Sequence, residues 1–231
     1  MNPPLAKPTR TLAERSELLA RARLYFVCEA RPHGRDPEPL LHAALRGGAD
    51  IIQLREKAPR CAEELIAYSE PFRRAAAEHD ALFILNDRPD LVEACGADGV
   101  HVGQDDVPVA EARAQAGPDA LVGLSTHSEA QFDAALAARG DARPDQVSVG
   151  PVWETPTKAG RPATGLELVR YAAACGGDAA WFAIGGVDAD TIGDVVAAGA
   201  RRAVVVRAIR DAADPEAAAR TLRAALEAAG G

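Results

Sequence analysis

Long apolar stretches and aromatic side chains are both scarce in this chain. No apolar run approaches the roughly 20 residues that a membrane-spanning helix requires, and the N-terminus, MNPPLAKPTRTLAERSELL, lacks the apolar core of a signal peptide. Aromatic residues make up only 4% of the 231 residues, so the core should be aliphatic. We therefore expect a cytoplasmic protein with no membrane partner.

Cysteine is scarce as well, and its spacing excludes a zinc site of the usual kind. The four cysteines lie far apart in the sequence and form no CxxC pair or Cys/His cluster. We expect them to be reduced and mostly buried thiols.

The chain has no excess of positive charge. Its formal net charge is −8 and its pI is near 5.2, which argues against a general nucleic-acid binder, although local basic pockets are still compatible with it. Hydrophobic residues account for 48% and charged residues for 26%, as in ordinary soluble globular proteins. We expect small molecules as partners; the composition leaves a homo-oligomer open.

Short apolar segments alternate regularly with Ala-rich amphipathic segments. The expected strands are Leu24–Val27, Ile51–Leu54, Leu82–Leu85, Gly99–Val102, Leu121–Leu124, Val147–Val149, Trp181–Ile184 and Ala203–Val206. The expected helices between and after them are Pro39–Leu45, Ala62–Glu78, Asp90–Cys95, Val109–Ala116, Glu129–Arg139, Leu166–Ala174, Ala189–Ala198 and Pro215–Ala229. Nearly continuous apolar strands joined by helices indicate a parallel sheet covered by helices.

Eight such units in a chain of this length favour a single (β/α)8 barrel, the TIM-barrel fold, over an open sheet. We expect residues 1–22 to form a short N-terminal extension and residues 23–231 to form the catalytic barrel. Within the extension, Thr11–Ala22 is a candidate helix, with Thr11 as its N-cap and Glu14 as the capping-box partner. In such a barrel the chemistry lies where strands end and the following loops begin.

Basic side chains follow the second expected strand. If alternate residues face the same way, Gln53, Arg55 and Lys57 point into the barrel together. The guanidinium fork of an arginine beside the point charge of a lysine suits a phosphate group. The alternative is that these cations pair with Glu56 or with other nearby acids.

Acidic side chains follow the third and fourth expected strands. Asn86 and Asp87 end one strand, and Asp105 and Asp106 follow the next. Since parallel strands direct their carboxyl ends into one mouth, these acids form an oxygen-rich site suited to a hard divalent cation. The alternative is a pair of solvated acidic turns.

The remaining strand ends carry hydroxyl groups and glycines. Ser125 follows the fifth strand without a GxSxG nucleophile motif, so we expect it to hydrogen-bond an anion or a polar ring. The long loop after the sixth strand contains Thr155, Thr157 and Lys158, which suit phosphate oxygens, and long loops on barrel mouths often act as lids. The turns after the last two strands, with Gly186 in the first of them, match the common phosphate cradle of these barrels.

Taken together, these motifs closely resemble those of thiamine-phosphate synthases. The matching segments occur in the family's order, from about Leu24 to Ala229: QLREK (53–57), ND (86–87), HVGQDD (101–106), GLSTH (123–127), TPTK (155–158), IGGV (184–187) and VRAI (206–209). The resemblance implies a transferase that joins 4-amino-2-methyl-5-(diphosphooxymethyl)pyrimidine to 4-methyl-5-(2-phosphooxyethyl)thiazole. The products would be thiamine phosphate and pyrophosphate, formed by a dissociative reaction assisted by Mg²⁺.

The resemblance also implies roles for individual residues. The pyrimidine diphosphate would be held by the QLREK segment and three residues outside it: Gln53, Leu54, Arg55, Glu56, Lys57, Asn86, Ser125 and Lys158. The thiazole phosphate would be held by Thr155, Pro156, Thr157, Gly186, Val206 and Arg207. The catalytic charge and hydrogen bonds would come from Arg55, Lys57, Ser125 and Lys158, and Mg²⁺ would be bound by Asp87 and Asp106, with Asp105 behind them.

Some features depart from the family pattern or leave alternatives open. The N-terminal extension lies outside the family pattern, and the loop after the first strand is long. Arg207 stands where many relatives carry a small hydroxyl residue, so Arg207 either pairs with the thiazole phosphate or caps the barrel rim.

An isomerase on the same barrel would use His101 or His127 as an acid or base. A Schiff-base aldolase would use Lys57 or Lys158. A phosphate-sensing protein without activity would lack the metal-binding acids, whereas both are present.

Overall fold

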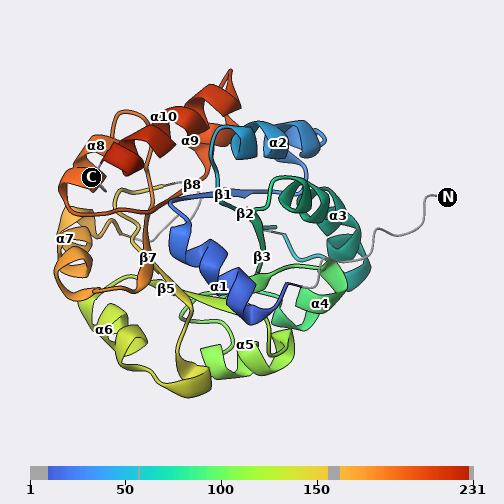
Figure 1. Cartoon of the computed structure of the whole chain (residues 1–231), viewed down its shortest axis with the longest axis horizontal. Helices are drawn as coiled ribbons and strands as arrows, with labels where there is room; N and C mark the ends of the chain where they lie inside the picture. Colours follow the sequence, from blue (N-terminus) through green and yellow to red (C-terminus); the bar gives the residue numbers. More distant parts are fainter. Residues whose placement is uncertain (1–9, 57, 156–161, 229–231) are drawn as a thin grey trace.

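Eight parallel strands close into a barrel that is surrounded by helices. In the computed structural model, which describes residues 10–56, 58–155 and 162–228, each strand pairs in parallel with its neighbours in sequence and β8 returns to β1. Figure 1 shows the ring of helices outside the strands. The strands are β1 (Leu24–Cys28), β2 (Ile51–Leu54), β3 (Leu82–Asn86), β4 (Gly99–Val102), β5 (Leu121–Thr126), β6 (Gln146–Val149), β7 (Ala180–Ile184) and β8 (Ala203–Val205). The expected barrel is therefore confirmed.

The helices occupy the positions expected from the amphipathic pattern, with several differences at their ends. They are α1 (Leu12–Arg21), α2 (Glu38–Arg46), α3 (Ala62–Glu78), α4 (Val92–Cys95), α5 (Val109–Ala116), α6 (Glu129–Ala137), α7 (Gly165–Cys175), α8 (Ile192–Ala197), α9 (Arg207–Arg210) and α10 (Pro215–Ala228). Short 3₁₀ turns lie at Pro32–Gly34, Pro89–Leu91 and Gly140–Ala142. None of the helices in the described part of the chain is long and apolar enough to span a membrane.

Several helices differ from the expected ones: the helix expected over Ala189–Ala198 begins only at Ile192 as α8. The segment expected as one helix over Asp90–Cys95 is a 3₁₀ turn over Pro89–Leu91 followed by the short α4, because the Val92 backbone bonds to the Pro89 carbonyl three residues earlier instead of continuing an α-helix. The helix expected to reach Arg139 stops at Ala137, where Ala138 adopts an extended backbone. Helix α9 was missed, since four residues are too few to show a helical period.

Apolar side chains form two separate layers. The larger layer packs between the outer face of the strands and the helices. The smaller one fills the inside of the barrel, where Tyr25 on β1 meets Phe182 on β7 edge-on at 5.7 Å between ring centroids. Cys28 and Cys95 are buried as expected, but Cys61 and Cys175 are exposed at helix ends, so the expectation of mostly buried thiols holds for only half of them.

Helix α1 lies across the end of the barrel at which the strands begin (Figure 1). Its Leu19 joins the apolar layer inside the barrel. Arg15 donates to Asp98, just before β4, and to the carbonyl of Asp119, just before β5, while Arg202 donates to the carbonyls of Ala20 and Ala22 at the C-terminal end of α1. The helix thus closes the bottom of the barrel and leaves the opposite end open.

The capping box expected at the start of α1 is present, and it supports a test of the helix. The Thr11 hydroxyl accepts from the Glu14 backbone at 3.3 Å, and the Glu14 carboxylate accepts from the Thr11 backbone at 2.7 Å.

Replacing Thr11 by Ala should lower the free energy of unfolding by about 1 kcal/mol, as for other N-caps. Urea denaturation measures this change. Thr221→Ala is the matched control, because that hydroxyl only bonds the preceding turn inside α10 and Ala is the better helix former. Equal unfolding midpoints for Thr11→Ala and wild type would show that the cap does not stabilise α1.

Candidate active site

A cavity of about 310 Å³ opens at the end of the barrel where the strands end. It is lined from all sides of the barrel, by Tyr25, Val27, Gln53, Arg55, Asn86, His101, Ser125, His127, Ser148, Pro151, Thr155, Ile184, Gly185, Gly186, Val187, Asp188, Val204, Val206, Arg207, Ala208 and Asp211. Eight of the expected site residues are among them: Gln53, Arg55, Asn86, Ser125, Thr155, Gly186, Val206 and Arg207. The fold therefore brings into one cavity residues that are more than 150 positions apart in the sequence.

Strand β2 delivers two of these side chains to the cavity. Gln53 is only 4% exposed, and its side-chain amide donates to the side-chain amide oxygen of Asn86 at 3.2 Å, which holds both amides side by side. Arg55 follows the strand, and its backbone is held by the Cys28 carbonyl at 3.0 Å. Lys57, expected on the same face, lies outside the described residues.

The other two residues of this segment turn away from the cavity. Leu54 is buried between the strands and the helices. Glu56 accepts from the Ala30 backbone at 2.8 Å and from Arg60 at 3.2 Å, so it ties down the loop after β1. Leu54 and Glu56 can thus contact a ligand in this cavity through their backbone only.

The two candidate metal-binding acids stand at the ends of neighbouring strands. Asp87 follows β3 in the left-handed backbone region, with φ at +60°, and its backbone donates to the His101 carbonyl at 3.0 Å. Asp106 follows β4 and accepts from the Gly103 backbone at 2.7 Å. Both are exposed to solvent. No group of three or more His, Cys, Asp or Glu residues suited to a metal occurs within the described ranges.

Ser125 lies at the floor of the cavity and is paired with a histidine. It is only 3% exposed, and its hydroxyl is 2.9 Å from Nε2 of His101 on β4. His127, two residues later, points its Nδ1 at the Gly150 carbonyl at 2.5 Å and thereby links β5 to the loop after β6. His101 thus lies inside the barrel and lines the same cavity as Ser125.

The loop after β6 is attached to the turn after β7 at its base. The Val152 and Trp153 backbones donate to the carbonyls of Ile184 and Gly185 at 2.8 and 3.1 Å. A Cβ atom at Gly186 would lie 2.8 Å from the Trp153 Cβ, and the backbone there has φ at +72°. Close packing against this loop therefore requires a glycine at Gly186, independently of any ligand. Thr155 lies in the cavity wall, whereas Pro156, Thr157 and Lys158 lie outside the described residues.

Strand β8 ends in a charged rim. Arg210 on α9 donates to Glu29 at 2.8 Å and to both carboxylate oxygens of Asp211, which also meets His33 at 2.8 Å. The hydrogen bond from Arg210, with His33 as a smaller contributor, lowers the pKa of Asp211, and the pKa of Arg210 is raised mainly by that same bond. Arg207 is exposed on the cavity wall nearby. Arg210 is paired with two acids and does not line the cavity, so Arg207 is the arginine of α9 on the cavity wall.

Several cavity residues were not anticipated. Tyr25 and Ser148 are on inward-facing positions of β1 and β6, and strand alternation alone could have identified them. Burial is the main reason that the pKa of Tyr25 is raised, with the Gln146 amide beside it opposing the shift, so the phenol is un-ionised. Asp188 and Asp211 come from loops, and no sequence pattern indicates that they reach the cavity.

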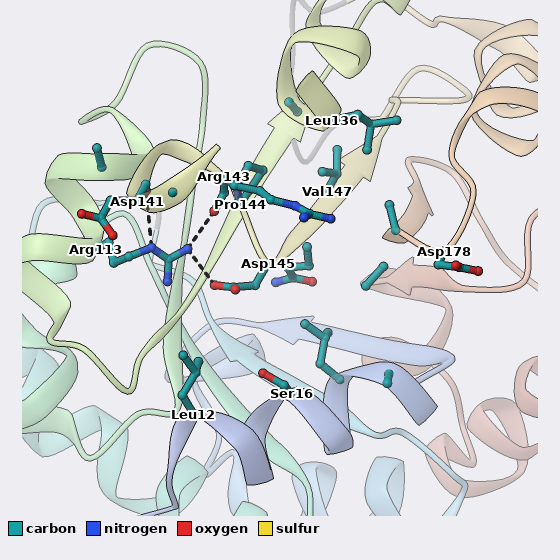
Figure 2. A pocket seen from close by; sticks show the side chains of 18 of the residues that line it. Leu12, Ser16, Arg113, Leu136, Asp141, Arg143, Pro144, Asp145, Val147 and Asp178 are labelled. Atoms are coloured by element: carbon teal, nitrogen blue, oxygen red, sulfur yellow. Dashed lines mark hydrogen bonds and ion pairs between the residues drawn. The ribbon is translucent and has the colours of Figure 1, made fainter. Parts of the chain in front are cut away.

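A larger cavity, of about 780 Å³, lies at the opposite end of the barrel. Figure 2 shows it between α1, which carries Leu12 and Ser16, and the segment around Arg143 and Asp145. None of the expected site residues that the structure describes lines it. We call it the bottom groove, and its position at the beginning of the strands sets it apart from the end where these barrels carry their chemistry.

Comparison with known proteins points in one direction. Residues 24–209 match the family described as "Thiamine monophosphate synthase". The thiamine-phosphate synthase of Mycobacterium leprae is 49% identical to this chain, with 99% of each chain covered. That of an Arthrobacter species is 50% identical and covers 91% of this chain and 97% of its own length.

A solved structure agrees with these sequence matches. Thiamine phosphate pyrophosphorylase from Pyrococcus furiosus superposes with a TM-score of 0.81 at 29% sequence identity, covering 93% of this chain and 100% of its own. The region that matches the family contains every strand of the barrel and every residue of the cavity wall except Asp211.

Proposed function

Since the chain belongs to the thiamine monophosphate synthase family, whose members are transferases, we propose that its upper cavity makes thiamine phosphate from two phosphorylated precursors. The substrates would be 4-amino-2-methyl-5-(diphosphooxymethyl)pyrimidine and 4-methyl-5-(2-phosphooxyethyl)thiazole, and pyrophosphate would be the second product. The supporting observation is that one cavity joins Arg55 and Ser125 on one side to Gly186 and Arg207 on the other. Two anion-binding sides facing one space suit two phosphorylated substrates.

The pyrimidine diphosphate is assigned to the side formed by β2, β3 and β5. The adjacent amides of Gln53 and Asn86 suit the hydrogen-bonding edge of an aminopyrimidine. Arg55 supplies a bidentate fork for the diphosphate, and Ser125 supplies a hydroxyl at the floor. Lys57 and Lys158 would add charge from the flanking loops.

The thiazole phosphate is assigned to the side formed by the last three loops. Gly186, Val206 and Arg207, at the start of the short α9, line this space, and the guanidinium group of Arg207 would bind a phosphate. Thr155 and Thr157 of the preceding loop would contribute hydroxyl groups.

Asp87 and Asp106 fit a magnesium ion that is shared with the substrate. Mg²⁺ in proteins usually takes one or two carboxylates and completes its shell with water and substrate phosphates, so two exposed acids at neighbouring strand ends are a suitable donor set. When bound there, the ion would neutralise charge on the departing pyrophosphate.

The side chains of the cavity favour a dissociative reaction. Arg55, Ser125 and the flanking lysines would stabilise negative charge on the leaving pyrophosphate, while the pyrimidinylmethyl cation forms and is captured by the thiazole nitrogen. The loop after β6, attached to β7 at its base, would exclude water from that cation. Such a reaction needs no protein nucleophile.

The proposed function is tested by incubating the purified protein with both substrates, with and without Mg²⁺. We expect thiamine phosphate and pyrophosphate to appear in equal amounts only when both substrates are present, and Mg²⁺ to be required. Absence of thiamine phosphate under all conditions would contradict the proposal. Trapping of a carbonyl substrate on a lysine by borohydride would instead identify a Schiff-base enzyme.

Ser125→Ala should reduce activity without abolishing it. A hydrogen bond to a charged group contributes about 1.5–3 kcal/mol, which corresponds to roughly a ten- to hundredfold loss of kcat/KM. Steady-state kinetics with the pyrimidine diphosphate measure this loss, and mass spectrometry checks for covalent species. Complete loss of turnover, together with a pyrimidinyl adduct on wild-type Ser125, would make this residue a nucleophile.

A further inference from the structure

Two backbone N–H groups in the turn after β7 have no acceptor among the residues that the structure describes. They belong to Gly186 and Val187, which both line the upper cavity, and Val187 is only 5% exposed. Buried backbone N–H groups are paired in the great majority of cases. Two successive unpaired donors on a cavity wall therefore indicate a ligand that carries acceptor atoms, such as an anion.

The carbonyl groups of the same two peptides have partners outside the cavity wall. The Gly185 carbonyl accepts from the Trp153 backbone at 3.1 Å, and the Gly186 carbonyl accepts from the Thr191 hydroxyl at 3.0 Å. Neither Trp153 nor Thr191 lines the upper cavity. Because the C=O and N–H bonds of a trans peptide point in opposite directions, these contacts turn the two N–H groups toward the cavity side.

Asp188 and Thr191 fix the loop that follows this turn. The Thr191 hydroxyl accepts from the Asp188 backbone at 2.9 Å, and Oδ1 of Asp188 accepts from the backbones of Asp190 and Thr191 at 3.1 and 3.0 Å. Such short-range hydrogen bonds of an Asp side chain stabilise one loop conformation. Through the Thr191 hydroxyl, that conformation is joined to the Gly186 carbonyl.

The position of Asp188 is unexpected for an acid, because it places a negative charge on the wall of a cavity suited to anions. The Thr191 hydroxyl lies 3.0 Å from both Oδ1 of Asp188 and the Gly186 carbonyl, and its single hydrogen cannot serve both fully. A charged acceptor competes more strongly than a neutral one. The charge of Asp188 therefore works against the bond to Gly186, and the loop requires only its oxygen.

We propose that Asp188 and Thr191 are positioning residues, which hold the peptide between Gly186 and Val187 with its N–H directed at a phosphate group in the upper cavity. Asp188 does so as an acceptor of hydrogen bonds and not through its charge. The identity of that group as the phosphate of the thiazole rests on the proposed function. The arrangement itself does not, because all of its hydrogen bonds lie within the protein.

The role of Thr191 is tested with inorganic phosphate as the probe, by following the assigned Val187 amide signal in nuclear magnetic resonance spectra of the ¹⁵N-labelled protein. We expect phosphate to shift this signal in the wild type. Thr191→Val keeps the shape and removes the hydroxyl, so the dissociation constant should rise about fivefold, the size of one lost hydrogen bond. Thr191→Ser restores the hydroxyl and should bind phosphate like the wild type.

The control is Thr221→Val, the same chemical change at a hydroxyl that bonds only the preceding turn of α10, and it should leave phosphate affinity unchanged. With the two substrates, Thr191→Val should raise KM for the thiazole phosphate and leave KM for the pyrimidine diphosphate as it is. An equal rise of both KM values would mean that Thr191 supports the fold in general, and it would contradict the proposal.

Two substitutions of Asp188 separate its oxygen from its charge. Asp188→Asn and Asp188→Ala both remove the negative charge, but only Ala removes the acceptor used by the backbones of Asp190 and Thr191. We expect the Asn variant to bind inorganic phosphate at least as tightly as the wild type. The Ala variant should bind it about fivefold more weakly than the Asn variant.

Three results of the phosphate titrations would overturn the inference. They are a Val187 signal that does not respond to phosphate, equal affinities of Thr191→Val and Thr191→Ser, and equal affinities of Asp188→Asn and Asp188→Ala. None of them depends on the formation of thiamine phosphate. If phosphate binds as described and no thiamine phosphate is formed, the proposed function fails and the positioning role stands.

Discussion

Replacing Asp87 or Asp106 by Asn should lower turnover on the order of a hundredfold while the fold stays intact. The substitution keeps the size of the side chain and removes the charge that a magnesium ion requires. Losing one preorganised element that stabilises transition-state charge typically costs about a hundred- to a thousandfold in kcat. The measurement is kcat as a function of Mg²⁺ concentration for wild type and both variants.

The control for these two variants is Asp178→Asn, an exposed acid on the bottom groove, which should retain wild-type turnover. Circular dichroism and unfolding curves establish that all variants are folded. If the wild type is fully active in buffer freed of divalent cations, or if both variants respond to Mg²⁺ like the wild type, Asp87 and Asp106 do not hold a catalytic metal.

Arg55→Lys should lower kcat/KM for the pyrimidine diphosphate about ten- to hundredfold although the charge is conserved. An arginine can donate two parallel N–H hydrogen bonds to a diphosphate, whereas a lysine offers a single point charge. One good charge-assisted hydrogen bond contributes about 1.5–3 kcal/mol, which sets this range. Arg201→Lys, an exposed site far from the cavity, is the control for the same chemical change. Identical kcat/KM values for wild type and Arg55→Lys would show that Arg55 has a structural role only.

The sequence predicted the barrel well because every unit repeats the same physical pattern. Apolar runs such as Ile51–Leu54 and Gly99–Val102 are strands with the expected bounds, and α3 and α5 also begin and end as expected. The capping box of Thr11 and Glu14 was identified because it depends on residues three positions apart. Errors occurred where the local pattern was short, as in α4 and α9.

The candidate site was predictable only in part. Residues at strand ends, such as Arg55, Asn86 and Ser125, could be placed by counting along each strand, and the structure does gather them in one cavity. The contribution of Asp211 could not be predicted, because it depends on contacts with Arg210 and with His33, which lies 178 positions away. Sequence reasoning interpreted Gly186 as part of a phosphate cradle, whereas the structure adds a second reason, the close approach of Trp153.

Gly123 on β5 shows why contacts inside the barrel are hard to infer from sequence, since a Cβ atom there would lie within 2.6 Å of both His101 Nδ1 and Gln146 Nε2. Nothing in the letters around Gly123 or Gln146 marks them as partners, since they lie 23 positions apart and meet only through the register of β5 and β6. Their relation to His101 needs three neighbouring strands to be in place. Such contacts follow from the closure of the barrel rather than from any local propensity.

The most direct test of the proposed chemistry follows a single turnover with pyrimidine diphosphates that carry electron-withdrawing substituents. If pyrophosphate leaves before the new bond forms, the substituent destabilises the developing cation, and the chemical step should slow strongly while no covalent enzyme species appears. A chemical step that is insensitive to the substituent, or a pyrimidinyl-enzyme species in the mass spectrum, would contradict the dissociative account.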